Sequence, residues 1–292
     1  MGTRIDSLEV VRVSDGDTIV VKLNGEDESL RLTCVDTEES WATGGKPVTK
    51  AGKLASEMAK AYFPVGSTVD IEFDTDDSVD VCLTKHRGNY GRLLVYVHKG
   101  GENYSLKLVR EGWSPYFVKY GRSRVYDNEM RAAEAEAQAK ALIVWNPDTN
   151  AGGPSRDYRV LVPWWHYRMS AVDMHRLDGS PGLSVRLDYP RIKEAARNGE
   201  TVRVLCDLQG GYRQATSTGA VVYAGSPAQK FNLWIPDTHT PEGEQILELV
   251  RRRYAGEGGR GYVYATGAAS LYGEIPQIVL TDHAQLTEDS GA

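Results

Sequence analysis

The sequence is poor in the patterns that mark several classes of protein. Its 292 residues include three cysteines, Cys34, Cys82 and Cys206, and no CxxC pair. Neither a disulfide framework nor a zinc site is therefore predicted, and the thiols are expected to be core residues in a reducing compartment. No apolar run approaches the ~18 residues that a membrane-spanning helix needs, so no membrane partner is predicted.

The opening residues also lack an apolar stretch of signal-peptide length. The chain as written is therefore expected to be cytoplasmic. A secreted protein whose leader had been removed would look the same.

An excess of positive charge, typical of nucleic-acid-binding domains, is missing too. The formal net charge is −6; residues 1–150 hold 19 Lys and Arg against 24 Asp and Glu, and residues 151–292 hold 15 against 16. Thirteen of those fifteen C-terminal cations are arginines, which bind phosphate in bidentate fashion better than lysines do. Charge alone therefore does not decide for or against nucleic acid.

The length predicts two domains, at the usual ~100–200 residues per domain. In the first half, strands are expected at 7–13, 18–23, 29–35, 68–73 and 92–98, and helices at 51–63, 106–111 and 126–141. This order favours a small closed barrel with appended helices over a βαβ array. Two prolines, two glycines and no apolar run in 146–157 indicate a linker, so we place domain one at 1–146 and the linker at 147–157.

The second half, 158–292, is expected to begin with helices at 163–176 and 189–198, the first with Pro163 at its first position. Strands are then expected at 201–208, 215–223, 230–236, 261–266 and 277–281, with a helix at 241–254. The order along the chain, three strands, a helix and two strands, is the same as in the first half. The predicted fold class is thus mainly β with helices (α+β), with a five-stranded barrel in each domain, the second over about 201–286.

Polar residues that suit phosphodiester chemistry stand in three segments of the first domain: DGDT at 15–18, RLTCVDTEE at 31–39 and YGR at 90–92. If the first strands pair, Asp17 and Asp36 converge, and converging carboxylates repel unless a cation bridges them. Oxygen ligands suit Ca²⁺ or Mg²⁺. Arg31 and Arg92 would then neutralise charge on a phosphoryl group, and Glu39 could orient or deprotonate a water. Each piece alone is ordinary, because Asp-Gly is a common hairpin turn.

Taken in order, the motifs DGDT, RLTCVDTEE, NYGR and the helix EAEAQAKALIVW resemble the staphylococcal nuclease (thermonuclease) family across the whole first domain. The resemblance implies an oligonucleotide-binding (OB) barrel with helices. It also implies Ca²⁺-dependent cleavage of DNA and RNA to 3′-phosphate and 5′-hydroxyl ends. Separately, we expect single-stranded DNA or RNA to be the preferred partner.

The resemblance also implies roles for individual residues. Asp17 and Asp36 resemble the carboxylate metal ligands, and Thr37 resembles the ligand that uses its backbone carbonyl. Arg31 and Arg92 resemble the phosphate-binding arginines, and Glu39 the general base or water-positioning residue. Tyr120 falls where the family's nucleotide-pocket tyrosine is expected, with Tyr116 nearby. Tyr90 and Arg87 are further substrate-binding candidates, although an exposed loop explains Arg87 equally well.

The chain departs from the family pattern at three places. Glu38 stands where the family usually has proline, and could share the role of Glu39. Val118 replaces a second pocket tyrosine. Gly88 and Asn89 stand where the type member has an acid and a lysine that contact the terminal phosphate.

Signals in the second domain are less specific. Residues 201–286 look like the end of an OB-type barrel, and such barrels bind single strands through aromatic grooves. Nucleic-acid candidates there are Tyr262, Tyr264, Tyr272, Arg251 and Arg252. The pair Trp164-Trp165 favours packing over base stacking, and the acidic run at 74–80 favours a solvated turn over a second cation site.

The sequence therefore predicts a Ca²⁺-dependent nuclease of DNA or RNA, whose second domain assists single-strand binding. The alternative is a non-catalytic scaffold that binds nucleic acid or protein through a nuclease-like barrel. Retention of the metal carboxylates favours the enzyme.

Overall fold

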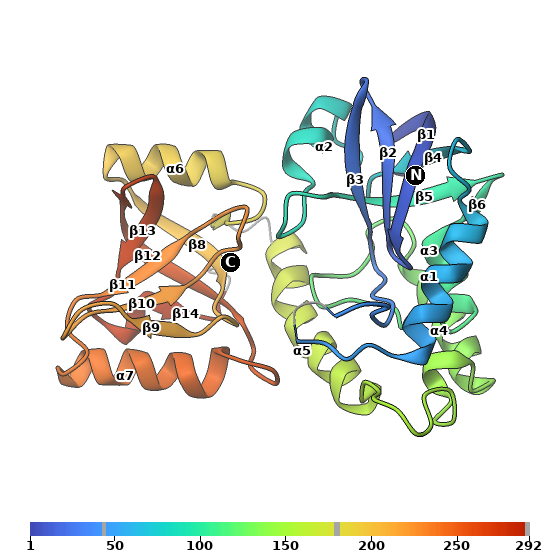
Figure 1. The fold of residues 1–292 in the computed structure, drawn as a ribbon. Coiled ribbons are helices and arrows are strands. Elements are labelled where there is room, and N and C mark those ends of the chain that lie inside the picture. The colour runs from blue at the N-terminus through green and yellow to red at the C-terminus, as the bar shows by residue number, and fades with distance from the viewer. Residues whose placement is uncertain (43–44, 178–181, 290–292) are drawn as a thin grey trace. The chain divides into compact units, whose positions relative to one another are not determined.

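A computed structural model describes residues 1–42, 45–177 and 182–289 (Figure 1). The chain divides into two units, one formed by 1–118 with 122–165 and the other by 119–121 with 166–292. The residues predicted as a linker, 147–157, group with the first unit. The domain boundary at residue 146 remains a prediction from composition.

The first unit is built around a five-stranded mixed barrel. Its strands are β1 (Arg4–Asp15), β2 (Thr18–Leu23), β3 (Glu26–Leu32), β4 (Thr68–Glu72) and β5 (Leu93–Lys99), with the short β6 (Glu102–Asn103) beside β5. The strand order is β3-β2-β1-β4-β5-β6, and β3 also pairs in parallel with β5, which closes the barrel. The predicted barrel of domain one is confirmed.

Closure of the barrel depends on the long strand β1, which pairs with two neighbouring strands. Its first half pairs with β4 through Leu8↔Val69, and its second half pairs with β2 through Val10↔Val21. The register shifts between Ile5 and Leu8, where Ser7 has φ 60°. Bulges of this kind bend a strand and increase its twist, so the β1 hairpin can curl toward β5.

Helices fill the connections of this unit. They are α1 (Lys50–Tyr62), α2 (Val79–Lys85), α3 (Tyr104–Arg110), α4 (Asp127–Ala139), the 3-10 turn η1 (Ile143–Trp145) and the start of α5 (Tyr158–Leu177). The Thr49 side chain caps α1 by accepting from the Gly52 amide at 3.0 Å. The predicted helices at 51–63, 106–111 and 126–141 correspond to α1, α3 and α4.

Two elements of this unit differ from the expectation. The acidic run at 74–80 is not simply a solvated turn, because it ends in α2 and the Asp74 carboxylate accepts from the amides of Arg124 and Val125. The helix expected to begin at Pro163 begins instead at Tyr158, with Pro163 inside it. Pro163 lies within the first two turns of that helix.

The second unit contains a mixed sheet covered by helices. Its strands are β7 (Leu183–Ser184), β8 (Thr201–Asp207), β9 (Tyr212–Gln214), β10 (Ala220–Tyr223), β11 (Asn232–Ile235), β12 (Tyr262–Tyr272), β13 (Ile275–Val279) and β14 (Leu286–Thr287). The order is β7-β8-β12-β13-β11-β10-β9, with β14 beside β12. The helical elements are α6 (Tyr189–Asn198), α7 (Pro241–Leu249), the π-helical turn η2 (Val250–Tyr254) and η3 (His283–Gln285).

The prediction of a closed second barrel is wrong. Among the residues that the structure describes, no ladder joins the terminal strands β9 and β7, so the sheet is open. Strand β9 has three residues, all exposed, so it offers no apolar face that closure would bury. The expected strands and helices exist, but their order along the chain does not determine closure.

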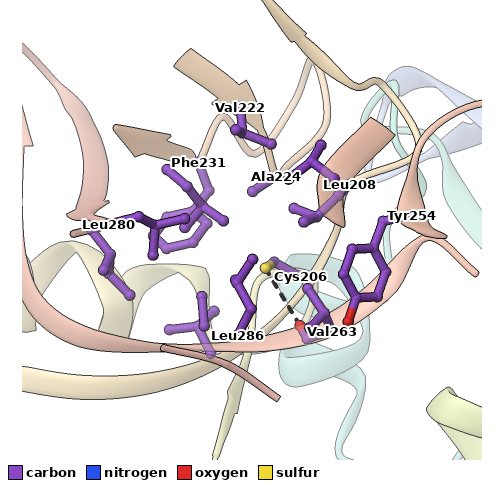
Figure 2. Close-up of a cluster of buried hydrophobic side chains, with 14 of the residues drawn as sticks. Cys206, Leu208, Val222, Ala224, Phe231, Tyr254, Val263, Leu280 and Leu286 are labelled. Atoms are coloured by element: carbon purple, nitrogen blue, oxygen red, sulfur yellow. Dashed lines mark hydrogen bonds between the residues drawn. The ribbon is translucent and has the colours of Figure 1, made fainter. Parts of the chain in front are cut away.

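A continuous hydrophobic core stabilises the second unit (Figure 2). Ile192 from α6 and Ile246 from α7 lie in one core with Phe231, which precedes β11, and Val263 of β12, all at most 1% exposed. Cys206 lies in this core with its thiol directed to the Val263 carbonyl at 3.5 Å. All three cysteines are free and buried, as expected for core residues, and burial raises the pKa of the Cys82 thiol to about 11.

No described helix is both long and apolar enough to cross a membrane.

Candidate active site

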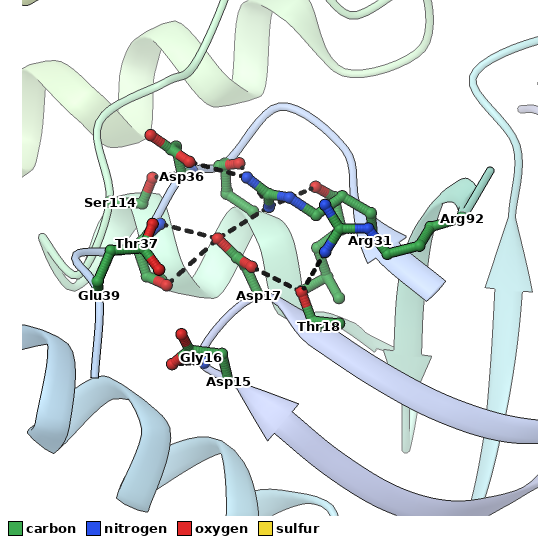
Figure 3. Close-up of polar contacts among 12 residues, drawn as sticks. Asp15, Gly16, Asp17, Thr18, Arg31, Asp36, Thr37, Glu39, Arg92 and Ser114 are labelled. Atoms are coloured by element: carbon green, nitrogen blue, oxygen red, sulfur yellow. Dashed lines mark hydrogen bonds and ion pairs between the residues drawn. The ribbon is translucent and has the colours of Figure 1, made fainter. Parts of the chain in front are cut away.

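Three chain segments of the first unit bring the predicted site residues together (Figure 3). The β1–β2 turn supplies Asp17, the end of β3 supplies Arg31, and the residue before β5 supplies Arg92. The antiparallel register sets Thr18 opposite Arg31, and the parallel β3–β5 register sets Arg31 opposite Leu94. Asp17 and Arg92, 75 positions apart in the sequence, are thus brought to the same edge because the barrel is closed there.

Close backbone approach fixes the turn and the loop against each other. A Cβ added at Gly16 would lie 2.8 Å from the Thr37 hydroxyl oxygen, and one added at Gly52 would lie 2.2 Å from the Glu39 carbonyl oxygen. Both distances are too short for a real side chain. Glycine at these two positions lets the β1–β2 turn and helix α1 pack directly against the loop that carries Asp36 and Glu39.

Arg31 bridges the two predicted metal ligands. Its Nη1 lies 2.8 Å from Asp17 Oδ2, and its Nη2 lies 2.8 Å from Asp36 Oδ1. Nη1 also donates to the Val35 carbonyl at 3.0 Å. The guanidinium therefore holds both carboxylates in one place, as the sequence spacing predicted for their convergence.

Asp36 is 4% exposed and has further cationic partners. Lys46 Nζ lies 3.1 Å from its Oδ1, and Arg156 Nη1 lies 2.9 Å from its Oδ2. Burial by itself would raise the pKa of this carboxyl, but the charges of Arg156, Lys46 and Arg31 hold it well below its usual range. The backbone amide of Asp36 donates to Ser114 Oγ at 2.8 Å, which fixes the loop at this residue.

Asp17 connects the loop to the second predicted arginine. Its Oδ2 accepts from the Thr37 amide at 3.1 Å, and its Oδ1 accepts from the Thr18 hydroxyl at 3.0 Å. Arg92 Nη1 donates to that same Thr18 hydroxyl at 3.1 Å. Arg92 thus reaches the edge of the cluster without forming an ion pair with Asp17.

The adjacent residues Glu38 and Glu39 have different environments. Glu39 faces the charged cluster and lies 3.0 Å from Lys46 Nζ. Burial raises the pKa of its carboxyl, and Lys46 partly offsets this effect. Glu38 is 1% exposed and accepts from Thr49 Oγ1 at 2.6 Å, Asn150 Nδ2 at 2.8 Å and the Tyr158 hydroxyl at 3.3 Å. Its carboxylate is fully engaged in holding the loop, so the geometry favours Glu39 for water chemistry.

The donor set fits a hard divalent cation in its chemistry. Two buried carboxylates and a neighbouring backbone carbonyl, all oxygen donors, are the ligand types that Ca²⁺ and Mg²⁺ prefer. Within the described ranges, no three or more acidic, histidine or cysteine side chains are placed to hold a metal ion together. Lys46 and Arg156 supply the positive charge at Asp36 in this structure.

The predicted substrate-binding residues of the first domain differ in exposure: some are accessible and others are buried or paired. Tyr90 is 72% exposed, with the Arg92 guanidinium 5.8 Å from its ring centre, so it is accessible beside the cluster. Arg87 pairs with Glu28 at 2.8 Å. Tyr116 is 2% exposed and donates to Asp127 at 2.9 Å, which makes it a core residue rather than the expected pocket residue. Tyr120 groups with the second unit.

In the second unit, most of the predicted nucleic-acid-binding residues already contact other residues of the same unit. The Arg168 guanidinium lies 4.7 Å from the Tyr262 ring centre, and that of Arg203 lies 4.2 Å from the Tyr264 ring centre. Tyr264 is 3% exposed, so it is not a groove residue. Accessible candidates are Tyr272, which is 72% exposed, and Arg251 and Arg252, which pair with Glu248.

Sequence reasoning missed Lys46, Asn150, Arg156 and Tyr158. Lys46 follows a Gly-Gly pair in a loop, and the other three lie in or next to the segment whose composition predicted a linker. No local pattern distinguishes them. They became visible as site residues only when the fold brought them to Asp36 and Glu38.

A barrel with acidic and arginine side chains gathered at one edge is the arrangement expected of a nuclease, and comparisons with known proteins agree with this class. The family model "Staphylococcal nuclease homologue" matches residues 29–147. The thermonuclease of Staphylococcus intermedius is 34% identical over 144 residues, covering 49% of this chain and 77% of that protein. The thermonuclease of Staphylococcus hyicus is 32% identical over 139 residues, covering 47% and 75%.

Endonuclease YncB of Bacillus subtilis is 33% identical over 147 residues, covering 48% of this chain and 64% of that protein. The chain belongs to the staphylococcal nuclease family, and its homology to thermonucleases supports a nuclease function. Residues 148–292 lie outside the family-model match, and each of these relatives covers about half of this chain.

Proposed function

We propose that the chain is a Ca²⁺-dependent nuclease that hydrolyses phosphodiester bonds of DNA or RNA to 3′-phosphate and 5′-hydroxyl ends. The observation that carries the proposal is the convergence of Asp17, Asp36, Arg31 and Glu39 at one barrel edge, the last three inside the segment that the family model matches. Asp17, Asp36 and the Thr37 carbonyl would hold the cation. When bound, it would stabilise negative charge on the phosphoryl oxygens.

The chain's own residues supply the remaining chemistry. Glu39 accepts a proton from the water that attacks phosphorus, and its partly buried carboxyl has a pKa closer to neutrality than that of an exposed glutamate. Arg31 and Arg92 neutralise the charge that develops on the phosphate. The bond between phosphorus and the 5′ oxygen breaks, so the phosphate stays on the 3′ side. Lys46 contacts Glu39 Oε1, so it must leave before that oxygen can accept the proton.

We infer a preference for single strands and an assisting role for the second unit. Tyr90 beside Arg92 offers an exposed ring on which an unpaired base could stack, and Tyr272 offers another in the second unit. A cytoplasmic location remains part of the proposal.

The deciding experiment is cleavage of fluorescent single- and double-stranded DNA and RNA by the full chain, with Ca²⁺ and with excess EGTA. We expect rapid cleavage with Ca²⁺ and background rates with EGTA. Undiminished cleavage in EGTA would refute the metal assignment, and binding without cleavage under all conditions would favour the scaffold alternative.

A further inference from the structure

Three residues beyond the family match contact the candidate site. The match ends at residue 147, whereas Asn150, Arg156 and Tyr158 lie further along the chain and belong to the same structural unit. Arg156 touches Asp36, and the other two touch Glu38. The segment 150–158, here called the latch segment, is therefore part of the site in this chain.

Arg156 is a built-in contact of Asp36 rather than a surface side chain that happens to reach it. Its side chain is 8% exposed, and its Nη1 lies 2.9 Å from Asp36 Oδ2. On its other side, the guanidinium lies 5.4 Å from the Tyr158 ring centre and 5.7 Å from that of Trp165. A cation over aromatic rings in a dry environment is strongly held.

The latch segment is anchored on both sides of Arg156. Asn150 donates to Glu38 at 2.8 Å and accepts from the Ala51 amide at 3.1 Å, which connects it to the start of α1. Tyr158 donates to the same Glu38 carboxylate at 3.3 Å. Glu38 thus takes the position of the family's usual proline and fixes the loop through hydrogen bonds to the latch segment.

The charge balance at the site makes Arg156 a competitor of a metal ion. Arg31, Lys46 and Arg156 all contact the Asp36 carboxylate. A divalent cation at the same carboxylate would meet these positive charges at short range, and like charges repel strongly where water is excluded. Lys46 is 40% exposed and can swing into water, whereas Arg156 is fixed by rings and anchors.

We propose that Arg156 is an internal counter-ion that competes with the divalent cation for Asp36 and so sets the metal affinity of the site. Metal loading then requires the contact between Arg156 and Asp36 Oδ2 to break. The inference rests on the proposed function, because it takes Asp36 as a metal ligand.

The test is Ca²⁺ binding by isothermal titration calorimetry on the full chain, without substrate. Arg156→Ala is expected to bind Ca²⁺ at least ~10-fold more tightly than the unmodified chain, and Arg156→Lys, which keeps the charge, to stay within ~3-fold of it. Arg159→Ala is the matched control, because its side chain is 92% exposed and pairs with Asp157. That control is expected to leave the affinity unchanged.

Two further measurements keep the result interpretable. Circular dichroism and thermal unfolding confirm that each variant is folded, and Tyr158→Phe, which removes one anchor without removing charge, is expected to tighten Ca²⁺ binding ~2–4-fold. Unchanged or weaker Ca²⁺ binding by folded Arg156→Ala overturns the proposal, as does failure of both forms to bind Ca²⁺.

Cleavage assays separate the two proposals. Ca²⁺-dependent cleavage together with an unchanged affinity in Arg156→Ala refutes only the counter-ion role. Tighter Ca²⁺ binding without cleavage by any form refutes only the nuclease function. Weaker binding of a nucleoside 3′,5′-bisphosphate by Arg156→Ala at unchanged Ca²⁺ affinity identifies Arg156 as a phosphate contact and also overturns the proposal.

Discussion

Buried charge is arranged differently in the two units. In the first, Asp36 draws cations from three separate segments, Arg31, Lys46 and Arg156, and Glu39 lies beside them. In the second, Arg168 pairs with Asp207 at 2.7 Å and lies against Tyr262, which completes a local structural contact. A buried ion pair alone therefore does not indicate a site. Asp36 is a site candidate because three cations meet at its carboxylate and two further acids, Asp17 and Glu39, contact the same cations.

The largest expected effect concerns chemistry in the first unit. Glu39→Gln is expected to lower the cleavage rate by ~10²–10⁴-fold, because a general base is lost. Single-turnover cleavage of labelled DNA measures the change. Glu57→Gln, on the exposed face of α1, is the control. If Glu39→Gln cleaves at the normal rate, the catalytic role assigned to this edge of the barrel is wrong.

Removal of the central ion pair of the second unit is expected to affect stability instead. Arg168→Ala should lower the free energy of unfolding by about 3 kcal/mol, because Asp207 then loses its cationic partner and the half-buried ring of Tyr262 its cation. Urea unfolding measures the loss. The cleavage rate per folded molecule should stay within ~2-fold. If a stable Arg168→Ala variant cleaves much more slowly, the ion pair of the second unit is not purely structural, and the contrast with the catalytic cluster of the first unit is wrong.

A pH series tests a structural ion pair within the first unit. Glu72 is fully buried, and burial alone would raise the pKa of its carboxyl, but hydrogen bonds from Tyr126, the Gly2 amide and Arg4 lower it. The ionised form is therefore favoured in the folded state, so its stabilisation is present above the ordinary glutamate pKa and is lost as the pH falls through the lower folded value.

Urea unfolding from pH 7 to pH 3 should accordingly show a steeper loss of stability in the unmodified chain than in Glu72→Gln. At pH 7 the variant should be less stable by about 2 kcal/mol, because a charged hydrogen-bond acceptor is lost. Parallel pH profiles for the two proteins would contradict the lowered pKa.

The smallest expected effect concerns strand binding by the second unit. Tyr272→Ala should weaken binding of single-stranded DNA by about 1 kcal/mol, because one base loses a stacking partner. Fluorescence anisotropy in EGTA measures it without cleavage. Tyr223→Ala, also on an exposed ring, is the control. Equal affinities in all three proteins would remove the support for a binding role at Tyr272.

The parts of the site that could be predicted are those whose partners are set by strand pairing. Asp17, Arg31 and Arg92 stand at strand ends, so the barrel register brings them together once the strands are recognised. Arg156 could not be predicted, because its contact with Asp36 depends on how the 147–157 segment packs. The choice between Glu38 and Glu39 likewise needed the three hydrogen bonds that engage Glu38.

The fold likewise has parts that local sequence patterns predict and parts that depend on tertiary packing. The predicted helices at 51–63 and 189–198 correspond closely to α1 and α6. The face that α1 packs is formed by small residues such as Ala51, Ala55 and Ala59, whereas the larger Leu54 is exposed, so its apolar spacing predicted the helix but not the packed face. Closure of the second sheet leaves no such signal, since it depends on whether two distant edges meet. The start of α5 at Tyr158 was missed because Pro163 suggested a later first turn.

Parallel pairing of β3 with β5 has a consequence for the order of folding. The turn with Asp17 and the strand with Arg31 belong to neighbouring hairpin segments, which form through short-range contacts. Arg92 arrives only when β5 pairs with β3 across about 60 intervening residues, a slower step because a long loop must close. Recovery of activity during refolding should therefore report the last long-range closure of the barrel, after most local structure has already returned.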